Sequence, residues 1–471
     1  MISTRLQRMK YVVCDFLTAN VAMLVFDIAR YFILQQWNQG YPNLENFLLS
    51  TNLLWEQAII PPILLVIYYF SGYYNLPFQK SRLQELFTTI ISCILYTLLI
   101  YFALLTNDQV QLRSTNYELL MSLFSIFFVF TYIGRISITS HCIRQMKKKH
   151  WSINTLIIGN SDKAHQMAKT LSDKKASKGY NIVGFVDIPG ENNAMGSTQS
   201  ISIDHIEEMC AKHKVATIII APENEQESTT LSLLYRLFPL NIPIKISPDT
   251  LSLLTSPIRL QNIYEEPLID ISSADISEAT KNIKRLLDII MSLTALIILA
   301  VPMLIVALII RLDSKGGIFY SQERIGYRQK PFYIRKFRTM RVDAESNGPQ
   351  LSSENDTRIT RVGRVLRKYR IDELPQFWNV LIGEMSMVGP RPERAFFIRQ
   401  IVKKAPYYTL IHQVRPGITS WGMVKYGYAQ NVDEMILRLR YDLIYLTNIS
   451  IMVDLKIIIY TVKTVFTGRG M

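Results

Sequence analysis

Four long apolar segments within the first 140 residues constrain the fold of this chain more than any other feature. Each can form a membrane-spanning helix, which needs ~20 residues to cross a hydrocarbon core about 30 Å thick. The first segment is too long for a signal peptide and lacks a cleavage site of small residues. The sequence therefore predicts a four-helix transmembrane domain at residues 1–145, with spans near residues 11–35, 56–73, 84–105 and 117–137.

Lys and Arg residues predict the orientation of these spans, because they are retained on the cytoplasmic side. Basic residues precede the first span, lie between the second and third, and follow the fourth, whereas residues 37–55 contain none. Residues 106–116 contain only Arg113. We therefore expect a multi-pass membrane protein whose N-terminus and C-terminal domains are cytoplasmic. The net charge of +14 agrees with basic loops that face anionic lipid.

Three ionisable side chains, Asp15, Asp27 and Arg30, lie inside the first predicted span. Charged groups at membrane depth are functional candidates. They can also pair between helices or lie near helix ends, and we favour this structural interpretation.

Residues 146–265 contain short β-branched runs separated by stretches of helical length, namely INTLIIG, NIVGFVD, VATIIIAP and IPIKIS. This alternation predicts a parallel sheet covered by helices, a Rossmann-like α/β domain. The first strand ends at Gly159, but Ser161 and Ala164 occupy the other two glycine positions of a GxGxxG phosphate loop. We therefore prefer a structural or regulatory module to a nucleotide-binding one, and the task of this domain stays open.

A fifth apolar segment, residues 286–310, is also long enough to cross the membrane. Both of its flanks are basic, so both prefer the cytoplasm. Pro302 lies within the run and should kink it, because proline lacks a backbone donor and clashes with the preceding turn. We predict a re-entrant helix over residues 283–312, with a fifth span as the alternative. The final segment, Ile449–Phe466, predicts either an interfacial helix or a core helix.

The C-terminal domain, residues 266–471, contains three stretches with candidate chemistry. The first, Gly317–Arg341, predicts a hairpin-like pair of strands in which Lys336 and Arg338 point to the same side. Two cations on one face suit an anionic ligand. Taken alone, however, a solvated basic face explains them better.

The second stretch, Thr357–Glu384, places Asp372 and Glu373 directly after a cationic helix that includes Arg367. A helix N-cap would explain an isolated Asp372. Two adjacent carboxylates among so many cations favour instead a site that also contains a metal or a phosphate. A carboxylate can act as a phosphoryl-accepting nucleophile, and a neighbouring one can bind Mg²⁺ or transfer a proton.

The third stretch, MSMVGPRPE, has Pro390 and Pro392 on either side of Arg391. The two prolines fix the backbone at this arginine. A rigidly placed guanidinium is a good bidentate ligand for phosphate. A rigid turn with an exposed arginine is an equally acceptable interpretation of the pattern alone.

Several other classes of function lack their sequence signatures here. No helix-turn-helix, zinc-finger or RNA-binding motif is present, so we expect no nucleic-acid partner. Walker A, GxSxG and HExxH motifs are also missing. The six histidines are scattered, with His412 alone in the C-terminal domain, which argues against a histidine-based mechanism.

Ordered motifs in residues 281–471 together resemble the bacterial sugar transferases, the monotopic phosphoglycosyl transferases. These motifs are KRLLDII followed by a proline, QERIG, KFRTM, DELPQFWNVLIGEMSMVGPRPE, VRPGITSWG, and YDLIYLTNIS followed by DLKI. The preceding four spans and α/β domain resemble the large members, such as the undecaprenyl-phosphate glucose or galactose phosphotransferases. Val301 departs from the pattern, because many small members have serine before the helix-breaking proline.

The resemblance implies an α-rich mixed catalytic domain that is attached to the bacterial inner membrane by a re-entrant helix. It implies that Asp372 is a nucleophile that attacks a UDP-sugar, expels UMP and forms an aspartyl-phosphosugar intermediate, which undecaprenyl phosphate then resolves. Glu373 is implied as its partner, with Mg²⁺ on the pair, and Arg367 and Arg391 match phosphate-binding positions. Such a reaction would initiate exopolysaccharide, capsule or O-antigen synthesis.

Two other functions are compatible with this organisation. One is a membrane-anchored binding or assembly protein of polysaccharide synthesis with an inactive transferase domain, but the intact DELPQ and GPRP motifs argue against it. The other is a nucleotide-sugar oxidoreductase, against which the missing glycines argue. The partners that we expect are a UDP-sugar, undecaprenyl phosphate and the lipid bilayer. A homo-oligomer, contacts with polysaccharide-assembly proteins and the identity of the sugar stay open.

Overall fold

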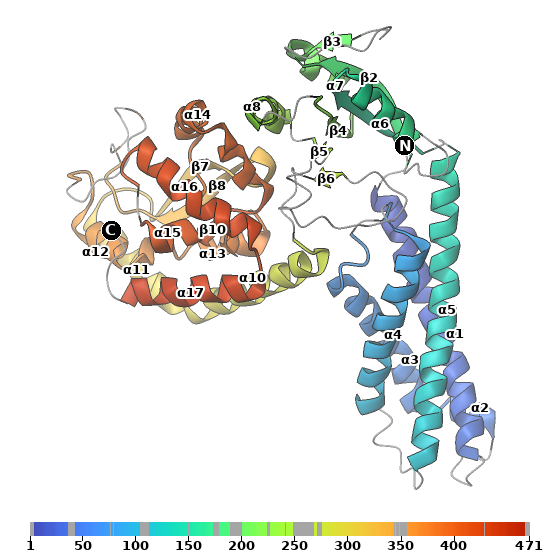
Figure 1. The fold of residues 1–471 in the computed structure, drawn as a ribbon. Coiled ribbons are helices and arrows are strands. Elements are labelled where there is room, and N and C mark those ends of the chain that lie inside the picture. The colour runs from blue at the N-terminus through green and yellow to red at the C-terminus, as the bar shows by residue number, and fades with distance from the viewer. Residues whose placement is uncertain are drawn as a thin grey trace.

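The fold is described from a computed structural model (Figure 1). The structure describes residues 4–35, 43–75, 77–78, 80–103, 113–148, 151–172, 179–188, 200–223, 227–240, 242–247, 268–270, 276–342, 344, 348, 356–427 and 429–466. Figure 1 shows three parts in chain order: an upright bundle of helices, an α/β unit above one end of the bundle, and a C-terminal domain beside it.

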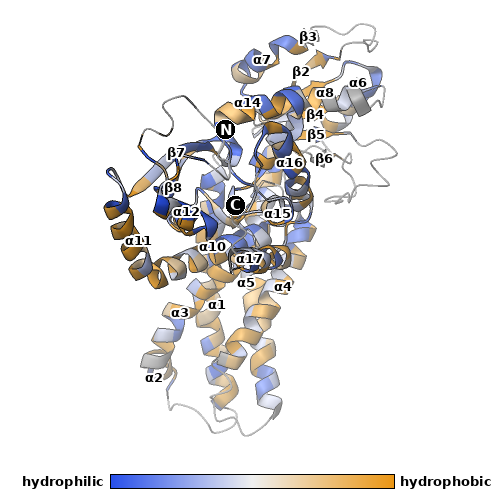
Figure 2. Ribbon diagram, turned by 90° about the vertical axis from the view of Figure 1, so that its left-hand side faces the viewer, coloured by the Kyte–Doolittle hydropathy of each residue, from blue (hydrophilic) through white to orange (hydrophobic). Residues whose placement is uncertain are grey.

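Four long helices form the bundle, with the short helix α2 (Leu44–Leu48) at one end. They are α1 (Thr4–Gln35), α3 (Thr51–Phe70), α4 (Arg82–Ala103) and α5 (Arg113–Lys147). All four are long and apolar enough to cross a membrane, which confirms the prediction of four apolar helices. Large apolar side chains are exposed on each of them, and a lipid environment explains this exposure. Figure 2 colours much of these helices as hydrophobic.

Two of the three ionisable side chains inside the first predicted span, Asp15 and Arg30, pair with other helices of the bundle. Within the described residues, Oδ1 of Asp27 is buried and accepts no hydrogen bond. Arg135 of α5 donates from Nε and Nη2 to the two carboxylate oxygens of Asp15, each at 2.9 Å. Arg30 pairs with Glu56 of α3 at 3.1 Å. These contacts agree with the structural interpretation, in which the charged groups connect the helices.

A six-stranded sheet forms the core of the α/β unit, in the order β3-β2-β1-β4-β5-β6. The first five strands of this order run parallel, and β6 is antiparallel to β5. The strands are β1 (Ile153–Ile158), β2 (Tyr180–Asp187), β3 (Ser200–Ser202), β4 (Thr217–Ile220), β5 (Ile244–Ile246) and β6 (Ile269–Asp270). The helices are α6 (Asp162–Ser172), η2 (Ile203–His205), α7 (Ile206–Lys212), α8 (Glu227–Leu237) and η3 (Phe238–Leu240). Strand β6 lies past the expected boundary at residue 265.

Polar side chains at the carboxyl ends of β1 and β2 pair with one another. The Asn160 amide donates to the Asp187 carboxylate at 2.9 Å, and the Asn160 carbonyl oxygen lies 2.9 Å from Nε2 of His165. Gly159 has φ of 121°, and a Cβ atom there would lie 2.3 Å from the carbonyl oxygen of Ala221. The loop therefore needs this glycine for close packing against β4.

The C-terminal domain begins with two helices that meet at a bend of 60°, α10 (Glu278–Ile298) and α11 (Ala300–Asp313). Ser277 caps α10 by accepting a hydrogen bond from the amide of Thr280 at 3.1 Å. The break falls at Leu299 rather than at Pro302. Proline has no amide hydrogen to donate to the carbonyl four residues before it, so the helix is weakened on the N-terminal side of Pro302.

The N-terminal end of α10 contacts the bundle where α3 ends. The Asn75 amide donates to Glu278 at 2.7 Å, and the Asn282 amide donates to the carbonyl of Tyr69 at 2.6 Å. Gly72, with φ of 78°, leaves no room for a Cβ atom against Glu278. The loop after α3 therefore places the start of α10 at the end of the bundle that the charge pattern predicts to be cytoplasmic.

The rest of this domain is mostly helical, with two small sheets. An antiparallel hairpin pairs β7 (Phe319–Ile325) with β8 (Pro331–Phe337), as the sequence predicted. Strands β9 (Ser386–Val388) and β10 (Gly417–Thr419) are parallel. The helices are η4 (Tyr327–Gln329), α12 (Arg361–Lys368), η5 (Ile371–Glu373), α13 (Gln376–Ile382), α14 (Ala395–Lys404), η6 (Pro406–Gln413), α15 (Trp421–Lys425), α16 (Val432–Thr447) and α17 (Ile451–Phe466).

Candidate active site

The two adjacent carboxylates lie on the short helix η5, between α12 and α13. The chain reverses at Arg370, which has φ of 55° in the left-handed region. Glycine is the usual residue after a helix in this conformation, and a non-glycine residue there costs about 1–2 kcal/mol. The reversal is fixed by hydrogen bonds from the amide of Arg370 to Arg367 at 3.1 Å and from the amide of Glu373 to Arg370 at 3.2 Å. Both carboxylates are buried as a result.

The hairpin strand β8 lies against these helices and supplies Lys336. Asn379 of α13 is fully buried and connects the two elements. Its carbonyl oxygen accepts from the amide of Arg335 at 3.1 Å, and its amide donates to the carbonyl of Tyr333 at 2.8 Å. This contact fixes the register between β8 and α13, so Lys336 reaches Glu373.

Three cations surround Glu373. Lys336 Nζ lies 2.7 Å from Oε1, Arg391 Nη2 lies 3.6 Å from Oε1, and Arg370 Nη1 lies 3.9 Å from Oε2. Burial alone would raise the pKa of Glu373, but the charges of Lys336, Arg391 and Arg370 outweigh it and keep the pKa below its ordinary range. Glu373 is therefore ionised throughout the physiological range.

Asp372 has a different environment, although it is the next residue in the chain. Within the described part of the chain its carboxylate accepts no hydrogen bond. Burial and the negative charge of Glu373 raise its pKa, Lys336 and Arg367 lower it, and the result is a pKa of about 6. Neighbouring groups with pKa values this far apart are typical of sites where one carboxylate reacts and the other positions charge.

The turn that carries Arg391 follows β9 and is fixed by backbone contacts. The amide of Gly389 donates to Thr419 of β10, and the amide of Gly417 donates to Pro390, each at 3.0 Å. A Cβ atom at Gly389 would lie 2.2 Å from the carbonyl oxygen of Arg415, so only glycine fits there. The close approach of the two strands thus sets the position of Pro390 and Arg391.

A buried ion network lies behind the same turn. Glu393 accepts from Arg438 of α16 at 2.7 Å and from Arg324 of β7 at 3.1 Å. Arg324 also donates to the carbonyl of Pro392 at 3.2 Å. The three side chains come from distant parts of the sequence and together fix the residues on the C-terminal side of Arg391.

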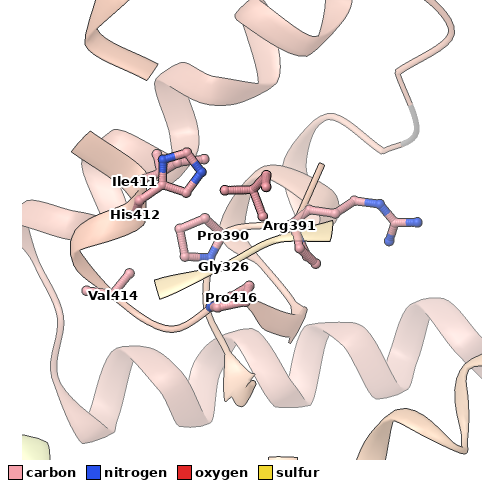
Figure 3. A pocket seen from close by; sticks show the side chains of 9 residues that line it. Gly326, Pro390, Arg391, Ile411, His412, Val414 and Pro416 are labelled. Atoms are coloured by element: carbon pink, nitrogen blue, oxygen red, sulfur yellow. The ribbon is translucent and has the colours of Figure 1, made fainter. Parts of the chain in front are cut away.

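A small hollow lies on the other side of the turn, as Figure 3 shows. In that view the Arg391 side chain extends away from the rings of Pro390, His412 and Pro416. His412 Nδ1 is buried and forms no hydrogen bond with any described residue. Burial lowers the pKa of His412 to about 4, so the imidazole is neutral at pH 7. The lining residues are Ile325, Gly326, Pro390, Arg391, Pro392, Ile411, His412, Val414 and Pro416.

The structure brings Asp372, Glu373, Lys336 and Arg391 together, and Arg367 acts on Asp372 through its charge. Arg367 Nε also donates to Thr339 at 2.8 Å. Arg338 does not join this group. Strand β8 ends at Phe337, so the alternation of sides is lost, and Arg338 donates to the carbonyls of Ser314 at 2.7 Å and Lys315 at 2.9 Å. Its contacts fix the segment after α11.

The two carboxylates could also take part in binding a metal ion. No group of three or more His, Cys, Asp or Glu ligands occurs among the described residues. Mg²⁺, however, is commonly bound by one or two carboxylates and completed by water and substrate phosphates. Among the described residues, Oε2 of Glu373 is buried and accepts no hydrogen bond, and Asp372 is the neighbouring residue in the chain. This donor set fits Mg²⁺ in the presence of a diphosphate.

Comparison with known proteins decides the family. The family model described as bacterial sugar transferase matches residues 279–468. The chain is also 39% identical over 198 residues to "Exopolysaccharide production protein PSS" of Rhizobium leguminosarum bv. phaseoli, which covers 98% of that protein and 40% of this chain. This chain belongs to the bacterial sugar transferase family. The family that its sequence motifs predicted is therefore confirmed.

Two relatives that are longer than the Rhizobium protein also align. One is "UDP-N-acetylgalactosamine-undecaprenyl-phosphate N-acetylgalactosaminephosphotransferase" of Aeromonas hydrophila, 38% identical over 230 residues. This match covers 49% of the chain and only 54% of that relative's length. The other is "UDP-glucose:undecaprenyl-phosphate glucose-1-phosphate transferase" of Escherichia coli, 26% identical over 363 residues, with 76% of the chain and 78% of the relative covered.

Proposed function

We propose that this protein is a phosphoglycosyl transferase that moves a hexose-1-phosphate from a UDP-sugar to undecaprenyl phosphate. The named activities of the Aeromonas and Escherichia relatives support the substrate classes. The observation that carries the proposal is the pair Asp372 and Glu373, two buried neighbours whose pKa values are shifted in opposite directions. The name of the Rhizobium relative supports a role in exopolysaccharide production. We propose that the reaction initiates synthesis of an exopolysaccharide, a capsule or an O-antigen.

In the first half of the proposed reaction, Asp372 is the nucleophile. Its carboxylate oxygen attacks the sugar-bearing phosphorus, the bond from that phosphorus to the bridging oxygen breaks, and UMP leaves with the electron pair. The product is an aspartyl-phosphosugar. A carboxylate must be ionised to attack, and a pKa of about 6 leaves Asp372 ionised at pH 7. It is also less stabilised by cations than Glu373, which keeps it reactive.

In the second half, a phosphate oxygen of the lipid carrier attacks the same phosphorus. The bond to Asp372 breaks, the carboxylate is regenerated, and the lipid-linked diphosphosugar leaves. Lys336 and Arg391 would face the charge that develops on the phosphoryl oxygens in both halves. Glu373 keeps these two cations in position through the contacts at 2.7 Å and 3.6 Å.

We also propose Mg²⁺ as the cofactor, with Asp372 and Glu373 as its protein ligands. When bound, the ion would neutralise charge on the diphosphate and so favour departure of UMP. The buried Oε2 of Glu373, which accepts no hydrogen bond from the described part of the chain, supports this assignment.

The helices α10 and α11 support a re-entrant attachment to the cytoplasmic side of the inner membrane. Their bend of 60° allows entry and exit on one face. The contact between Asn75 and Glu278 places the start of α10 beside the end of α3. Exposed apolar side chains on α10, α11 and α17 give this part of the domain a lipid-facing surface, which favours an interfacial position for α17 as well.

We describe the middle domain as Rossmann-like, because five of its strands run parallel in the order 3-2-1-4-5. At the carboxyl ends of β1 and β2, the Asp187 carboxylate already accepts a hydrogen bond from the Asn160 amide. This supports a structural or regulatory task over nucleotide binding.

The experiment that tests the function is release of UMP from a panel of UDP-sugars, with membranes that contain the protein, undecaprenyl phosphate and Mg²⁺. Release from one donor would identify the sugar. If no donor in a broad panel gives UMP above the level of membranes without the protein, the transferase proposal fails. A binding or assembly role with an inactive transferase domain would then be favoured.

A further inference from the structure

Six exposed cations surround the place where the chain leaves α11. Arg311 and Lys315 belong to the end of α11 and the segment after it, and three more lie on α12. The full set is Arg311, Lys315, Arg341, Arg361, Arg364 and Lys368, which we call the cationic face. Within the described residues, none of them forms an ion pair with a carboxylate, whereas the cations at the candidate active site do.

Packing between α11 and α12 brings these residues to one surface. Leu366 of α12 and Ile310 of α11 share a buried apolar cluster with Phe337, and Val362 packs against it. The backbone at Gly363 approaches Thr339 so closely that a Cβ atom would lie 2.1 Å from its carbonyl oxygen. With the apolar side of α12 buried, the residues at spacings of three and four, Arg361, Arg364 and Lys368, face outward.

Large apolar side chains are interspersed with these cations and are equally exposed. Leu312 is 79% exposed, Val342 is 77% exposed, and Val365 and Tyr369 are 54% and 40% exposed. Cationic and apolar side chains mixed on one exposed surface are typical of helices at a membrane interface, where the apolar groups enter the lipid and the charges stay at headgroup level.

The position of α12 relative to α11 indicates at what depth in the membrane the cationic face lies. This step rests on the proposed re-entrant attachment. Val301, Leu304 and Leu308 of α11 are largely exposed, as lipid contact requires. Figure 2 shows α11 as largely hydrophobic, with α12 beside it. Since α12 packs on the last turns of α11, it lies where the chain returns to the headgroups.

We propose that the cationic face binds the headgroups of anionic phospholipids in the cytoplasmic leaflet and so fixes the catalytic domain at the membrane surface. The six side chains are spread over one surface and do not converge on a buried pocket, which suits many headgroups better than a single phosphate. In the proposed function, the phosphate of the lipid carrier is bound instead by the half-buried cations Lys336 and Arg391.

The test uses the full-length protein in nanodiscs of phosphatidylcholine, with or without phosphatidylglycerol. Undecaprenyl phosphate is held at one fixed amount for hydrogen exchange and is varied to obtain its KM. The variant is the triple substitution Arg361→Gln, Arg364→Gln and Lys368→Gln. Two readouts are compared: hydrogen exchange of α12 and the segment after α11, and the KM for undecaprenyl phosphate. Each cation near an anionic surface contributes about fivefold to association. Phosphatidylglycerol should therefore slow exchange in the wild type by about tenfold or more, and the variant should lose most of this effect.

A matched control is available on α14, which Figure 1 places on the opposite side of the domain from α11 and α17. Arg399, Lys403 and Lys404 are exposed there, and their replacement by glutamine removes the same charge. This control should respond to phosphatidylglycerol as the wild type does. A second variant that changes Arg361 and Arg364 to lysine keeps the charge and should also keep the response.

Equal responses of the wild type and the glutamine variant to phosphatidylglycerol would overturn the proposal. So would a raised KM for undecaprenyl phosphate in both bilayers alike, because the face would then capture the lipid carrier. Hydrogen exchange does not depend on turnover. Absence of UMP release from the wild type would therefore sink the transferase function while the lipid response could still be measured.

Discussion

The Nζ atom of Lys336 lies 2.7 Å from Oε1 of Glu373, and this ion pair makes two neighbouring carboxylates chemically different. Lys336, the cation nearest to Glu373, helps to keep the pKa of Glu373 below its ordinary range. Burial raises the pKa of Asp372 to about 6. The hairpin and η5 create this asymmetry, because they place one lysine against one member of an adjacent pair. Each carboxylate can therefore have a separate role in the proposed reaction.

The first prediction concerns pH. Asp372 must be ionised to attack, so the second-order rate constant of the UMP burst should fall as pH drops through about 6, by about tenfold per unit below that value. The lipid phosphate has its own second pKa of about 6. The profile should therefore be measured on the first half-reaction, without the lipid acceptor. A rate that stays level from pH 7 to pH 5 would contradict the assignment of Asp372.

The second prediction concerns Lys336→Met. Lys336 lowers the pKa of Asp372, so its removal should raise that pKa and move the acid limb of the profile to higher pH. It also removes a cation from the phosphoryl site, so UMP release should fall on the order of a hundredfold or more. The matched control is Lys330→Met on the hairpin turn, an exposed lysine that should leave both the rate and the profile unchanged. A loss of rate without a shift of the limb would count against the electrostatic role.

The third prediction concerns Glu393, which we expect to act through Arg391. Glu393→Gln weakens the pairs with Arg324 and Arg438 that fix the turn, so kcat should drop by roughly tenfold to a hundredfold. In a double-mutant cycle with Arg391→Ala, Glu393→Gln should lower kcat little further, because the arginine through which Glu393 acts is already absent.

A control for this cycle is Asp433→Asn, which breaks the exposed ion pair between Asp433 of α16 and Lys404 of α14. Its effect should be the same with and without Arg391→Ala. If Glu393→Gln behaves in the same additive way, its role is structural and the prediction is wrong.

The fourth prediction concerns the bundle. Arg135 is fully buried between the rings of Tyr68 and Tyr73, with Asp15 as its counter-ion. Asp15→Asn should lower stability by about 3–5 kcal/mol, because it leaves a buried charge without compensation. The double variant Asp15→Leu and Arg135→Met should be less damaged than the single one. Thermal unfolding in detergent measures both. An Asp15→Asn protein that is stable but inactive would instead support a functional role for these charges.

Much of the fold follows from local patterns in the sequence. Apolar runs and flanking Lys and Arg residues predict the four helices, and β-branched runs predict β1, β2, β4 and β5. The strands β3 (Ser200–Ser202) and β6 (Ile269–Asp270) are too short to give a periodic signal. The sequence predicts the break at Pro302, whereas the structure has it at Leu299. The pattern shows the position of the proline but not that of the carbonyl, four residues earlier, that loses its hydrogen-bond donor.

The candidate site was predictable where neighbours in sequence are neighbours in space, as with Asp372 and Glu373. Arg338 lies apart from them, because the strand ends one residue too early for alternation to continue. The network of Arg324, Glu393 and Arg438 joins β7, the turn after β9, and α16. Helix and strand periodicities relate only residues that are close in the sequence, so they could not predict this network. The QERIG and GPRPE motifs contain two of the three, which is the signal that could have pointed to them.

The most direct test of the central claim is a single-turnover measurement without undecaprenyl phosphate. The purified protein is mixed with its UDP-sugar, and released UMP is counted against the amount of enzyme, for wild type and Asp372→Asn. The account predicts a burst of about one UMP per active enzyme, with a sugar-phosphate attached to the peptide that contains Asp372, and no burst from the variant. UMP release only after the lipid acceptor is added, or an undiminished burst from Asp372→Asn, would contradict it.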